Sequence, residues 1–215
     1  MATVADRLSA SNGLTFICDF SPPRAGDSRL LDQAGSLEAD FISVSYNPGR
    51  SVRVTSPLAA AAIRQSAGRD VIFTVATRDM NRLAIQSLLL GAQLLGLENV
   101  VSVRGDTLSS EDRELTVPVN DYRTTELIQS IATMNEGRDF RGLKLRAPTQ
   151  FCVGATIDLA HGVDREVSLT RKKVEAGAQF FLMQPVAGPQ ALSAFAESYA
   201  TTFGGPLPAP VFAGV

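Results

Sequence analysis

Three apolar segments of the sequence end in polar residues whose types and positions could do chemistry. Asp19, Gln184 and the triplet Arg104-Gly105-Asp106 each follow a run of apolar residues. Carboxylates and amides at the ends of buried strands are typical of α/β enzyme sites, because parallel strands end at one common edge. The pattern predicts one shared site that contains two carboxylates and an amide.

Each of these residues also has an ordinary structural explanation. Asp19 could accept hydrogen bonds from neighbouring amides. Asp106 could form an Asx turn after its glycine, and Gln184 could satisfy backbone groups near Pro185. The residues taken one by one leave both kinds of explanation open.

The chain alternates apolar runs of strand length with longer segments of helical spacing. This alternation predicts βα units and a parallel sheet. The predicted strands are residues 14–20, 41–46, 71–76, 100–103, 151–157, 179–183 and 210–214. The predicted helices are residues 28–39, 57–66, 80–95, 122–135, 166–175 and 189–202. Pro57 and Pro189 suit a first helical turn. The glycines that suit the left-handed position after a last turn are Gly68, Gly96, Gly137 and Gly177.

Repeated βα units favour an α/β fold of the (β/α)₈ TIM-type barrel class over an open doubly wound sheet, because no glycine-rich dinucleotide fingerprint follows the first strand. The seventh predicted strand, 210–214, comes at the end of the sequence, so we expect a barrel truncated after strand seven. An open seam would leave unpaired sheet edges. We expect a single, incomplete domain over residues 1–215, and favour a fragment over an open sheet or an edge covered by another protomer.

A polar segment, residues 107–121, follows the fourth predicted strand and is long for a βα loop. Loops of this length after a strand end are often lids or binding loops. A surface loop without a role is the equal alternative.

Composition excludes several classes of partner. The formal net charge is −2, and no cluster of basic residues is longer than 171–173, which argues against nucleic acid and acidic membranes. The first residues lack a signal-peptide pattern, and no segment reaches about 18 apolar residues. We expect a soluble, cytoplasmic protein with a small-molecule partner. Cys18 and Cys152 lie in apolar runs, where we expect core packing rather than a disulfide or a zinc site.

Motifs spread along the chain resemble those of methylenetetrahydrofolate reductases. They are 19–24 (DFSPPR), 41–46 (FISVSY), 77–81 (TRDMN), 88–96 (LLLGAQLLG), 104–106 (RGD), 134–137 (MNEG), 173–178 (KVEAGA) and 184–185 (QP). Their order and spacing hold from residue 14 to residue 186. The similarity is closest to the reductase module of bifunctional homocysteine S-methyltransferase/methylenetetrahydrofolate reductases.

The resemblance implies reduction of 5,10-methylenetetrahydrofolate to 5-methyltetrahydrofolate, with FAD at the carboxyl end of the barrel relaying hydride from NAD(P)H. Opening the folate ring needs a proton on N10, and the resulting iminium carbon accepts hydride, so an acid and a stabilising anion must face one ligand. By resemblance Asp19 is the acid, and Asp106 lies close to flavin and pterin. The family usually has glutamate at the position of Asp19, so the carboxyl is withdrawn by about 1.5 Å. Either the backbone compensates or the activity is altered.

The resemblance also implies binding roles. It places Gln184 on the folate, together with Asp19 and Asp106. The flavin contacts that it implies are Ser45, which replaces a threonine, Arg104, Gly105, Asp106 and Lys173. Without the resemblance, Ser45 is an ordinary strand residue, and a lysine in a helical run of basic residues is more often solvated.

Departures from the family pattern weaken the flavin contacts. Residues 74–77 read Thr-Val-Ala-Thr where the family commonly has His-Leu-Thr-Cys, and the aromatic residue usual near Thr156 is absent. His161, the only histidine, either matches a family histidine or faces solvent without a catalytic role. Arg78 suits either an anion or an ion pair with Asp79.

Three hypotheses therefore stand side by side. The first is a FAD-dependent folate reductase, the second is direct hydride transfer from NAD(P)H to the folate, and the third is a noncatalytic folate-binding subunit. The expected ligands are a folate and a nicotinamide nucleotide, with no metal. Association with further copies of the chain stays open.

Overall fold

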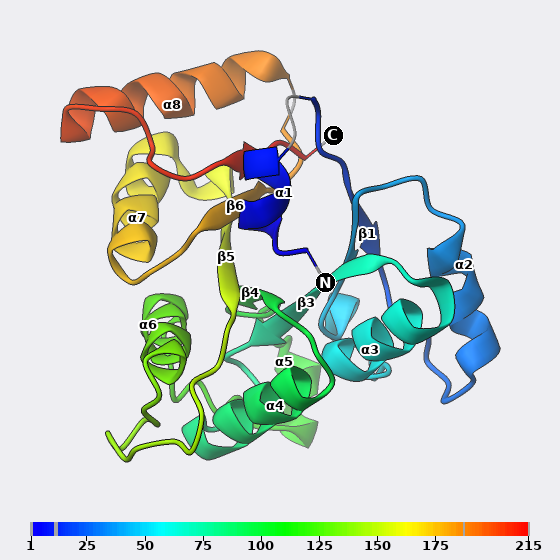
Figure 1. The fold of residues 1–215 in the computed structure, drawn as a ribbon. Helices are drawn as coiled ribbons and strands as arrows, with labels where there is room; N and C mark the ends of the chain where they lie inside the picture. The colour runs from blue at the N-terminus through cyan, green and yellow to red at the C-terminus, as the bar shows by residue number, and fades with distance from the viewer. Residues whose placement is uncertain (1, 11–12, 187, 215) are drawn as a thin grey trace.

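Seven parallel strands form the core of the structure, a computed structural model that describes residues 2–10, 13–186 and 188–214. Each strand pairs with its neighbours in sequence order, and the sheet curves into a nearly closed barrel (Figure 1). The strands are β1 (Ile17–Phe20), β2 (Phe41–Val44), β3 (Asp70–Ala76), β4 (Asn99–Val103), β5 (Cys152–Ile157), β6 (Phe180–Met183) and β7 (Val211–Phe212). The predicted TIM-type barrel and its seven strands are confirmed, although β1 and β7 are shorter than predicted.

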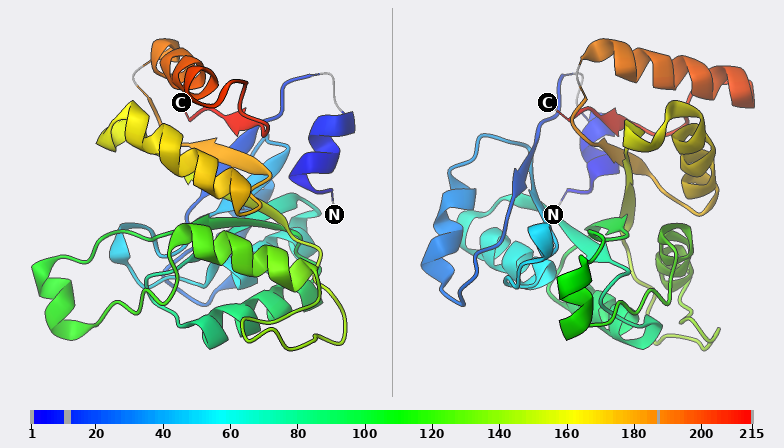
Figure 2. Two further views of the ribbon diagram at one scale, coloured as in Figure 1. Left: turned by 90° about the vertical axis from the view of Figure 1, so that its left-hand side faces the viewer. Right: turned by 180° about the vertical axis from the view of Figure 1, so that it is seen from behind.

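Helices pack around this barrel, with α1 at one end of it and α5 projecting from the body (Figures 1 and 2). The helices are α1 (Val4–Ala10), α2 (Asp32–Gly35), α3 (Ser56–Ala67), α4 (Arg82–Leu94), α5 (Ser110–Leu115), α6 (Thr124–Asn135), α7 (Val163–Glu175) and α8 (Pro189–Phe203). Short 3₁₀ turns occupy Ser28–Leu31, Pro48–Arg50 and Leu159–His161. Five of the six predicted helices are confirmed nearly in full.

The remaining predicted helix, residues 28–39, is wrong in its extent. A 3₁₀ turn is followed by the four-residue α2, which ends at Gly35. A Cβ atom at Gly35 would lie 2.9 Å from the Cβ of Ala67 on α3, so the chain comes too close to its neighbour for most side chains. Glycine, a weak helix former, ends α2 and allows it to pack closely against α3. Helices α1 and α5 were not among the predicted helices.

The predicted helix ends are confirmed. Pro57 and Pro189 lie in the first turns of α3 and α8. The four glycines after last turns have φ angles of 63, 73, 81 and 109° at Gly68, Gly96, Gly137 and Gly177 respectively. This left-handed conformation suits glycine because it has no Cβ atom.

One cluster of apolar side chains fills the barrel interior. It takes buried residues from five strands, namely Phe41, Ile72, Val101, Cys152 and Phe180, and adds Val4 of α1. Helix α1 is held there because the Val4 N–H donates to Asn99 Oδ1 at 2.9 Å and Asn99 Nδ2 donates to the Ala2 carbonyl at 3.1 Å. Helix α1 therefore closes the barrel at the amino ends of the strands.

A larger cluster packs the outer face of the sheet against the surrounding helices. Phe73, Val153 and Phe181 belong to it, together with side chains of α3, α4, α6, α7 and α8. Cys18 packs against this outer cluster and Cys152 is buried in the interior, and both are free thiols. The expected core packing of the two cysteines is confirmed. Burial raises the pKa of the Cys152 thiol.

The barrel has an open seam between β1 and β7. Within the described residues β1 pairs only with β2, and β7 pairs only with β6. Beside the seam Phe16 is 59% exposed and Leu14 is 84% exposed. The two sheet edges expected from the sequence are therefore present. No helix in the described part of the chain is long and apolar enough to cross a bilayer.

Candidate functional site

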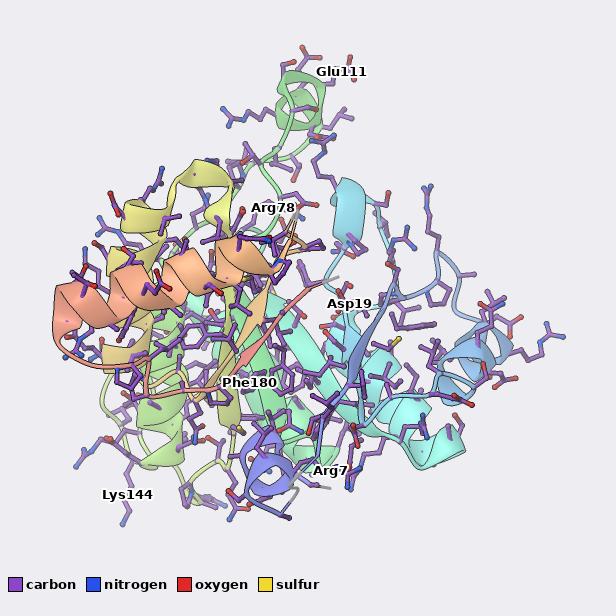
Figure 3. The ribbon with its side chains drawn as sticks, turned by 90° about the horizontal axis from the view of Figure 1, so that it is seen from above. Arg7, Asp19, Arg78, Glu111, Lys144 and Phe180 are labelled. Carbon is purple, nitrogen blue, oxygen red and sulfur yellow. The ribbon has the colours of Figure 1, made fainter. Side chains whose placement is uncertain are left out.

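The predicted site residues come from the carboxyl ends of the strands. Side chains alternate between the two faces of a strand. Asp19 follows the interior residue Ile17 by two positions, and Gln184 follows Phe180 by four, so both lie in register with the barrel interior. Figure 3 shows Asp19 toward the end of the barrel that also carries Arg78, with α1 and its Arg7 toward the other end.

Asp19 and Gln184 present free polar groups at this end. Both residues are exposed. Across the described residues, neither the Asp19 carboxylate nor the Gln184 side-chain amide has a hydrogen-bond partner. The backbone N–H of Gln184 donates to the Ile157 carbonyl at 2.8 Å and fixes the strand end itself. The alternatives in which Asp19 bonds neighbouring amides and Gln184 bonds backbone groups near Pro185 are therefore not what the structure shows.

Gly214, which follows β7, brings the chain close to the backbone around Gln184. A Cβ atom there would lie 2.5 Å from the Met183 carbonyl oxygen and 2.7 Å from the Pro185 nitrogen. Only glycine allows this approach, because any larger residue would push the chain away from the backbone of β6. The seam side of the site is thus closely packed at Gln184.

The end of β4 is built differently, because Asp106 is already engaged. Its Oδ2 accepts the N–H of Gly49 at 3.0 Å, which ties the end of β4 to the loop that follows β2. This contact spans 57 residues of sequence and replaces the local Asx turn that was the alternative. Asp106 is exposed, and within the described residues its other carboxylate oxygen has no hydrogen-bond partner.

Gly105 is required by the shape of the same turn. Its φ angle is +88°, which strains any residue with a Cβ atom. Such an atom would also lie 3.2 Å from the Cβ of Arg78 and 3.3 Å from that of Ala76. Gly105 is therefore required for the backbone conformation of this turn.

Arg78 holds both ends of the loop that follows β4. Its guanidinium donates to Asp79 at 2.6 and 2.7 Å and to the Asp106 carbonyl at 2.9 Å. Its own carbonyl accepts the N–H of Val119 at 2.7 Å. The ion pair with Asp79 that was one of two expectations is confirmed, and hydrogen bonding to Asp79 is the main cause that raises the pKa of Arg78.

Tyr46 lies beside the same ion pair. Burial is the largest influence on its phenol, followed by the nearby Asp79 carboxylate, and together they raise the pKa of Tyr46 to about 12. The phenol therefore stays protonated at neutral pH. It packs next to Asp79 as a neutral neighbour.

The segment 107–121 is anchored rather than loose. It contains α5, which opens with a capping box in which Ser109 and Asp112 exchange hydrogen bonds. Arg50, from the loop after β2, bonds Asp112 Oδ2 at 3.0 Å and the Thr107 carbonyl at 3.2 Å. Helix α5 projects from the body of the molecule (Figure 2), and its Leu115 is 90% exposed.

A small hollow lies between this segment and the end of β4. Its volume is about 40 Å³. The lining residues are Arg78, Arg104, Gly105, Asp106, Thr107, Leu108, Arg113, Pro118 and Asn120. Arg104 and Arg113 are exposed, and within the described chain their guanidinium groups have no hydrogen bond or ion pair. The hollow is therefore rich in positive charge.

Lys173 is engaged within the protein, and its flavin contact stays a prediction. Its ammonium is buried between α7 and β5, where it donates to Glu166 Oε1 at 2.7 Å and to the Thr156 carbonyl at 2.5 Å. The alternative of a solvated lysine is wrong, because the residue is only 4% exposed. Its ion pair and carbonyl contact give it a structural role in this chain.

The residues that the resemblance assigns to flavin differ in how free they are to contact it. Lys173 is engaged in its ion pair, and the aromatic residue usual near Thr156 is absent. Thr74, in place of histidine, is 9% exposed. Ser45, Arg104, Gly105 and Asp106 do lie at the carboxyl ends of β2 and β4, and their flavin contact stays a prediction. The described residues contain no group of three or more His, Cys, Asp or Glu side chains that could hold a metal.

His161 lies in the turn after β5 and is exposed, as the solvent-facing alternative predicted. Three contributors escaped the sequence reasoning, namely Gly49, Arg50 and Arg113. The run Asn47-Pro48-Gly49 after β2 is a strand end like the others and could have drawn attention to Gly49. Nothing in the sequence distinguishes Arg113 from other surface arginines.

Comparison with solved structures supports the barrel fold. An uncharacterized protein from Clostridium thermocellum, described as binding two copies of 5-methyl-5,6,7,8-tetrahydrofolic acid, matches with a TM-score of 0.63 at 12% identity over 95% of this chain. A 2,3-dimethylmalate lyase matches with a TM-score of 0.59 at 15% identity over 93% of this chain and 68% of its own. Phosphonopyruvate hydrolase in complex with oxalate and Mg²⁺ matches with a TM-score of 0.56 at 17% identity over 92% of this chain. The chain spans 66% of the length of the first and the third of these proteins.

Comparison of the sequence assigns the family. No curated protein matches the chain significantly. The family described as methylenetetrahydrofolate reductase matches over residues 4–215, which is nearly the whole sequence. The motifs around Asp19, Asp106 and Gln184 fall within this range. The chain belongs to the methylenetetrahydrofolate reductase family.

Proposed function

We propose that this chain binds 5,10-methylenetetrahydrofolate at the carboxyl end of the barrel and reduces it to 5-methyltetrahydrofolate with hydride from NAD(P)H. The observation that carries the proposal is the pair of free polar groups at Asp19 and Gln184. Family membership supports the reaction. The description of the Clostridium thermocellum protein as a binder of 5-methyl-5,6,7,8-tetrahydrofolic acid supports the ligand class.

The residues divide the chemistry between them. Asp19 donates a proton to N10 as the bond between N10 and the methylene carbon breaks, and the methylene carbon then accepts hydride. The balance is one NAD(P)H and one proton consumed for each 5-methyltetrahydrofolate and NAD(P)⁺ formed. Gln184 can donate and accept simultaneously, which suits the edge of a pterin ring. Asp106 supplies the negative charge that favours the iminium cation.

Asp106 suits this role because its position is fixed before the ligand arrives. The Gly49 N–H holds its carboxylate, Arg78 holds its carbonyl, and Gly105 allows the turn between them. A carboxylate held in place needs no reorganisation when positive charge develops nearby. The fixed frame at β4 and the free groups at β1 and β6 are complementary parts of one site in this proposal.

The route of the hydride has two candidates. The resemblance implies a relay through FAD, which would supply hydride from its reduced ring. Direct transfer from NAD(P)H to the folate is favoured by a specific observation, the engagement of Lys173 with Glu166 and the Thr156 carbonyl. A noncatalytic folate binder is the third candidate, prompted by aspartate in place of the usual glutamate at Asp19.

One absorption experiment separates these candidates. The purified chain is scanned between 350 and 500 nm with and without added FAD, then with NADH, then with methylenetetrahydrofolate. A band bleached by NADH and restored by folate supports the relay. Oxidation of NADH at 340 nm on addition of folate, with no flavin band, supports direct transfer. Folate binding without NADH oxidation would overturn the proposed reaction.

A further inference from the structure

We propose that the outer face of helix α4 is a dimerisation surface, on which a second copy of this chain packs its own α4 in the antiparallel direction. The face is formed by Leu83, Ser87, Leu90 and Leu94, and we call these four residues the α4 face. Their spacing of four, three and four residues places them on one side of a helix. The inference goes beyond the proposed function, because no residue of the barrel end belongs to this face.

The α4 face lies on a helix that carries almost no charge. Residues 83–97 contain no Asp, Glu, Lys, Arg or His. Helix α7 also packs against the sheet, but its exposed residues are polar or charged, namely Asp164, Arg165, Ser168, Lys172 and Glu175. A helix that is apolar on its outer side as well as on its inner side is typical of one that is covered on both sides. The composition of α4 therefore indicates a partner on its outer side.

Within the described chain the α4 face is uncovered. The buried residues of α4 lie on its other side and are Ile85, Gln86, Leu89 and Ala92. On the α4 face, Leu83, Leu90 and Leu94 are 64, 43 and 87% exposed. Helix α4 lies along the lower edge of the molecule in Figures 1 and 2. Leucines gathered on one exposed side of a helix form a patch, unlike single scattered apolar residues, and such patches mark interaction sites.

The order of large and small residues makes the α4 face self-complementary. A twofold axis at the middle of an antiparallel pair of helices brings each Leu83 against the partner's Leu94. The same axis brings each Leu90 against the partner's Ser87, so a large side chain meets a small one. Gly91 adds room beside this contact, because nothing lies within 4 Å of its Cβ position. A face that matches itself in this way fits a second copy of the same chain.

Electrostatics favour the same arrangement. Antiparallel helices place the positive amino end of each helix dipole beside the negative carboxyl end of the other. The α4 face has no charged side chain, so two copies bring no like charges together on it. A parallel pair would oppose like ends of the dipoles and would set Ser87 against the partner's Ser87, which leaves space between the helices.

The size of the surface sets the expected strength of the contact. Helix α4 has 13 residues and is about 20 Å long. A hollow of about 360 Å³ adjoins its carboxyl end, between α4 and α3, and is lined by Ala61, Arg64, Gln65 and Leu95. Stable interfaces bury about 800 Å² on each partner, and one short helix with this hollow offers less than that. We therefore expect a reversible dimer with a dissociation constant of roughly micromolar size.

The test measures the mass of the purified chain by sedimentation velocity at concentrations from about 1 to about 500 μM, a range that brackets the expected dissociation constant. Leu90→Glu places a charge in the middle of the α4 face, and Leu115→Glu is its matched control. Leu115 is 90% exposed on α5, outside the α4 face, so the control makes the same change elsewhere. Circular dichroism melting checks that both variants stay folded.

We expect the wild-type chain to pass from monomer to dimer over this range of concentration. Leu90→Glu should raise the dissociation constant of the dimer at least about tenfold, because it buries an unpaired carboxylate in the contact. Leu115→Glu should leave the dissociation constant unchanged.

A mixing experiment tests the antiparallel direction. Leu83→Glu and Leu94→Lys should each weaken the dimer when present alone, because a charge then faces leucine at both ends of the contact. An equimolar mixture should recover association, since the introduced carboxylate and ammonium meet at one end while leucine meets leucine at the other. In a parallel pair the two charges would stand at opposite ends, and the mixture would associate no better than either variant.

Three results would overturn the dimerisation surface. The first is a monomer at every concentration, the second is a dimer that Leu90→Glu leaves unchanged, and the third is an equal loss with Leu115→Glu. A mixture without recovery would overturn the antiparallel direction. No folate or nucleotide enters these measurements, so failure of the proposed function leaves their outcome unchanged.

Discussion

The end of β4 and the ends of β1 and β6 use their polar side chains in opposite ways. At β4, Asp106 and Arg78 are tied to Gly49, Asp79 and backbone carbonyls. At β1 and β6, Asp19 and Gln184 are exposed and without partners in the described residues. Free groups exchange water for a ligand without breaking bonds within the protein. The barrel end therefore has a free side, formed by Asp19 and Gln184, and a preformed frame, formed by Asp106 and Arg78.

Asp19→Asn should give the largest effect, because it removes the acid from the free side. We expect turnover with methylenetetrahydrofolate to fall by about 10²- to 10⁴-fold, the usual contribution of a general acid. Binding of 5-methyltetrahydrofolate should change only severalfold. Steady-state rates and calorimetry measure the two quantities. Unchanged turnover would remove Asp19 from the mechanism.

Asp19→Glu is the companion variant and tests how the backbone presents the carboxyl group. It restores the longer side chain usual in the family and should retain or raise the turnover. A large loss would show that the backbone of β1 is adapted to aspartate. Comparing the two variants thus separates the effect of the carboxyl group itself from the effect of the length of the side chain that carries it.

Lys173→Met should give the next largest effect, on stability, because it leaves Glu166 buried without its cation. Breaking a buried pair by removing one partner costs about 3–5 kcal/mol. Urea unfolding measures the loss. The double variant Lys173→Met/Glu166→Leu should recover much of it, because no unpaired charge remains. A variant that keeps full stability but loses binding of FAD would return Lys173 to the role that the resemblance implies.

Gly105→Ala should disturb the preformed frame. The +88° φ angle and the contacts with Arg78 and Ala76 predict a loss of about 1–3 kcal/mol in stability. Turnover should also fall, because Asp106 moves with the turn. Gly142→Ala is the matched control, since its φ angle is +79° and nothing lies within 4 Å of its Cβ position. Equal loss of turnover in both variants would contradict a special role for the turn at β4.

Gln184→Ala should give the smallest effect, because a single hydrogen bond contributes about 0.5–1.5 kcal/mol net. We expect the dissociation constant of 5-methyltetrahydrofolate to rise about tenfold or less, with binding of NADH unchanged. Stability should stay the same, because the side chain has no partner within the described residues. A loss of stability would show that the Gln184 side chain contributes to the fold rather than being available to a ligand.

The strands and most helices could be predicted from the sequence because their signals are local. Apolar runs of strand length, prolines in first turns and glycines after last turns lie within the elements that they define. Helix α5 carried a local signal as well, because Ser109 and Asp112 have the spacing of a capping box. Helix α1 did not, since its position depends on Asn99, 95 residues further along the chain.

The candidate site could be predicted only in part. The sequence marked the strand ends that carry Asp19, Asp106 and Gln184, because a polar residue after an apolar run is visible without a structure. The expectation of a solvated Lys173, made from the helical run of basic residues alone, is wrong, since the ammonium is buried in an ion pair with Glu166. The partners of Lys173 are the Thr156 carbonyl of β5 and Glu166, which lies two turns earlier in α7, and neither is adjacent to it in sequence.

By itself, the sequence determined the family, the barrel and the strand ends that carry polar side chains, because these follow from residue types and their order along the chain. Only the tertiary structure decided which of those side chains are free. Gly49, which donates to Asp106, lies 57 residues from it, and the Asp106 carbonyl that Arg78 contacts lies 28 residues from Arg78, so these distances depend on how the strands come together. A hydrogen bond forms only within about 3 Å, so availability for a ligand is a property of the folded chain.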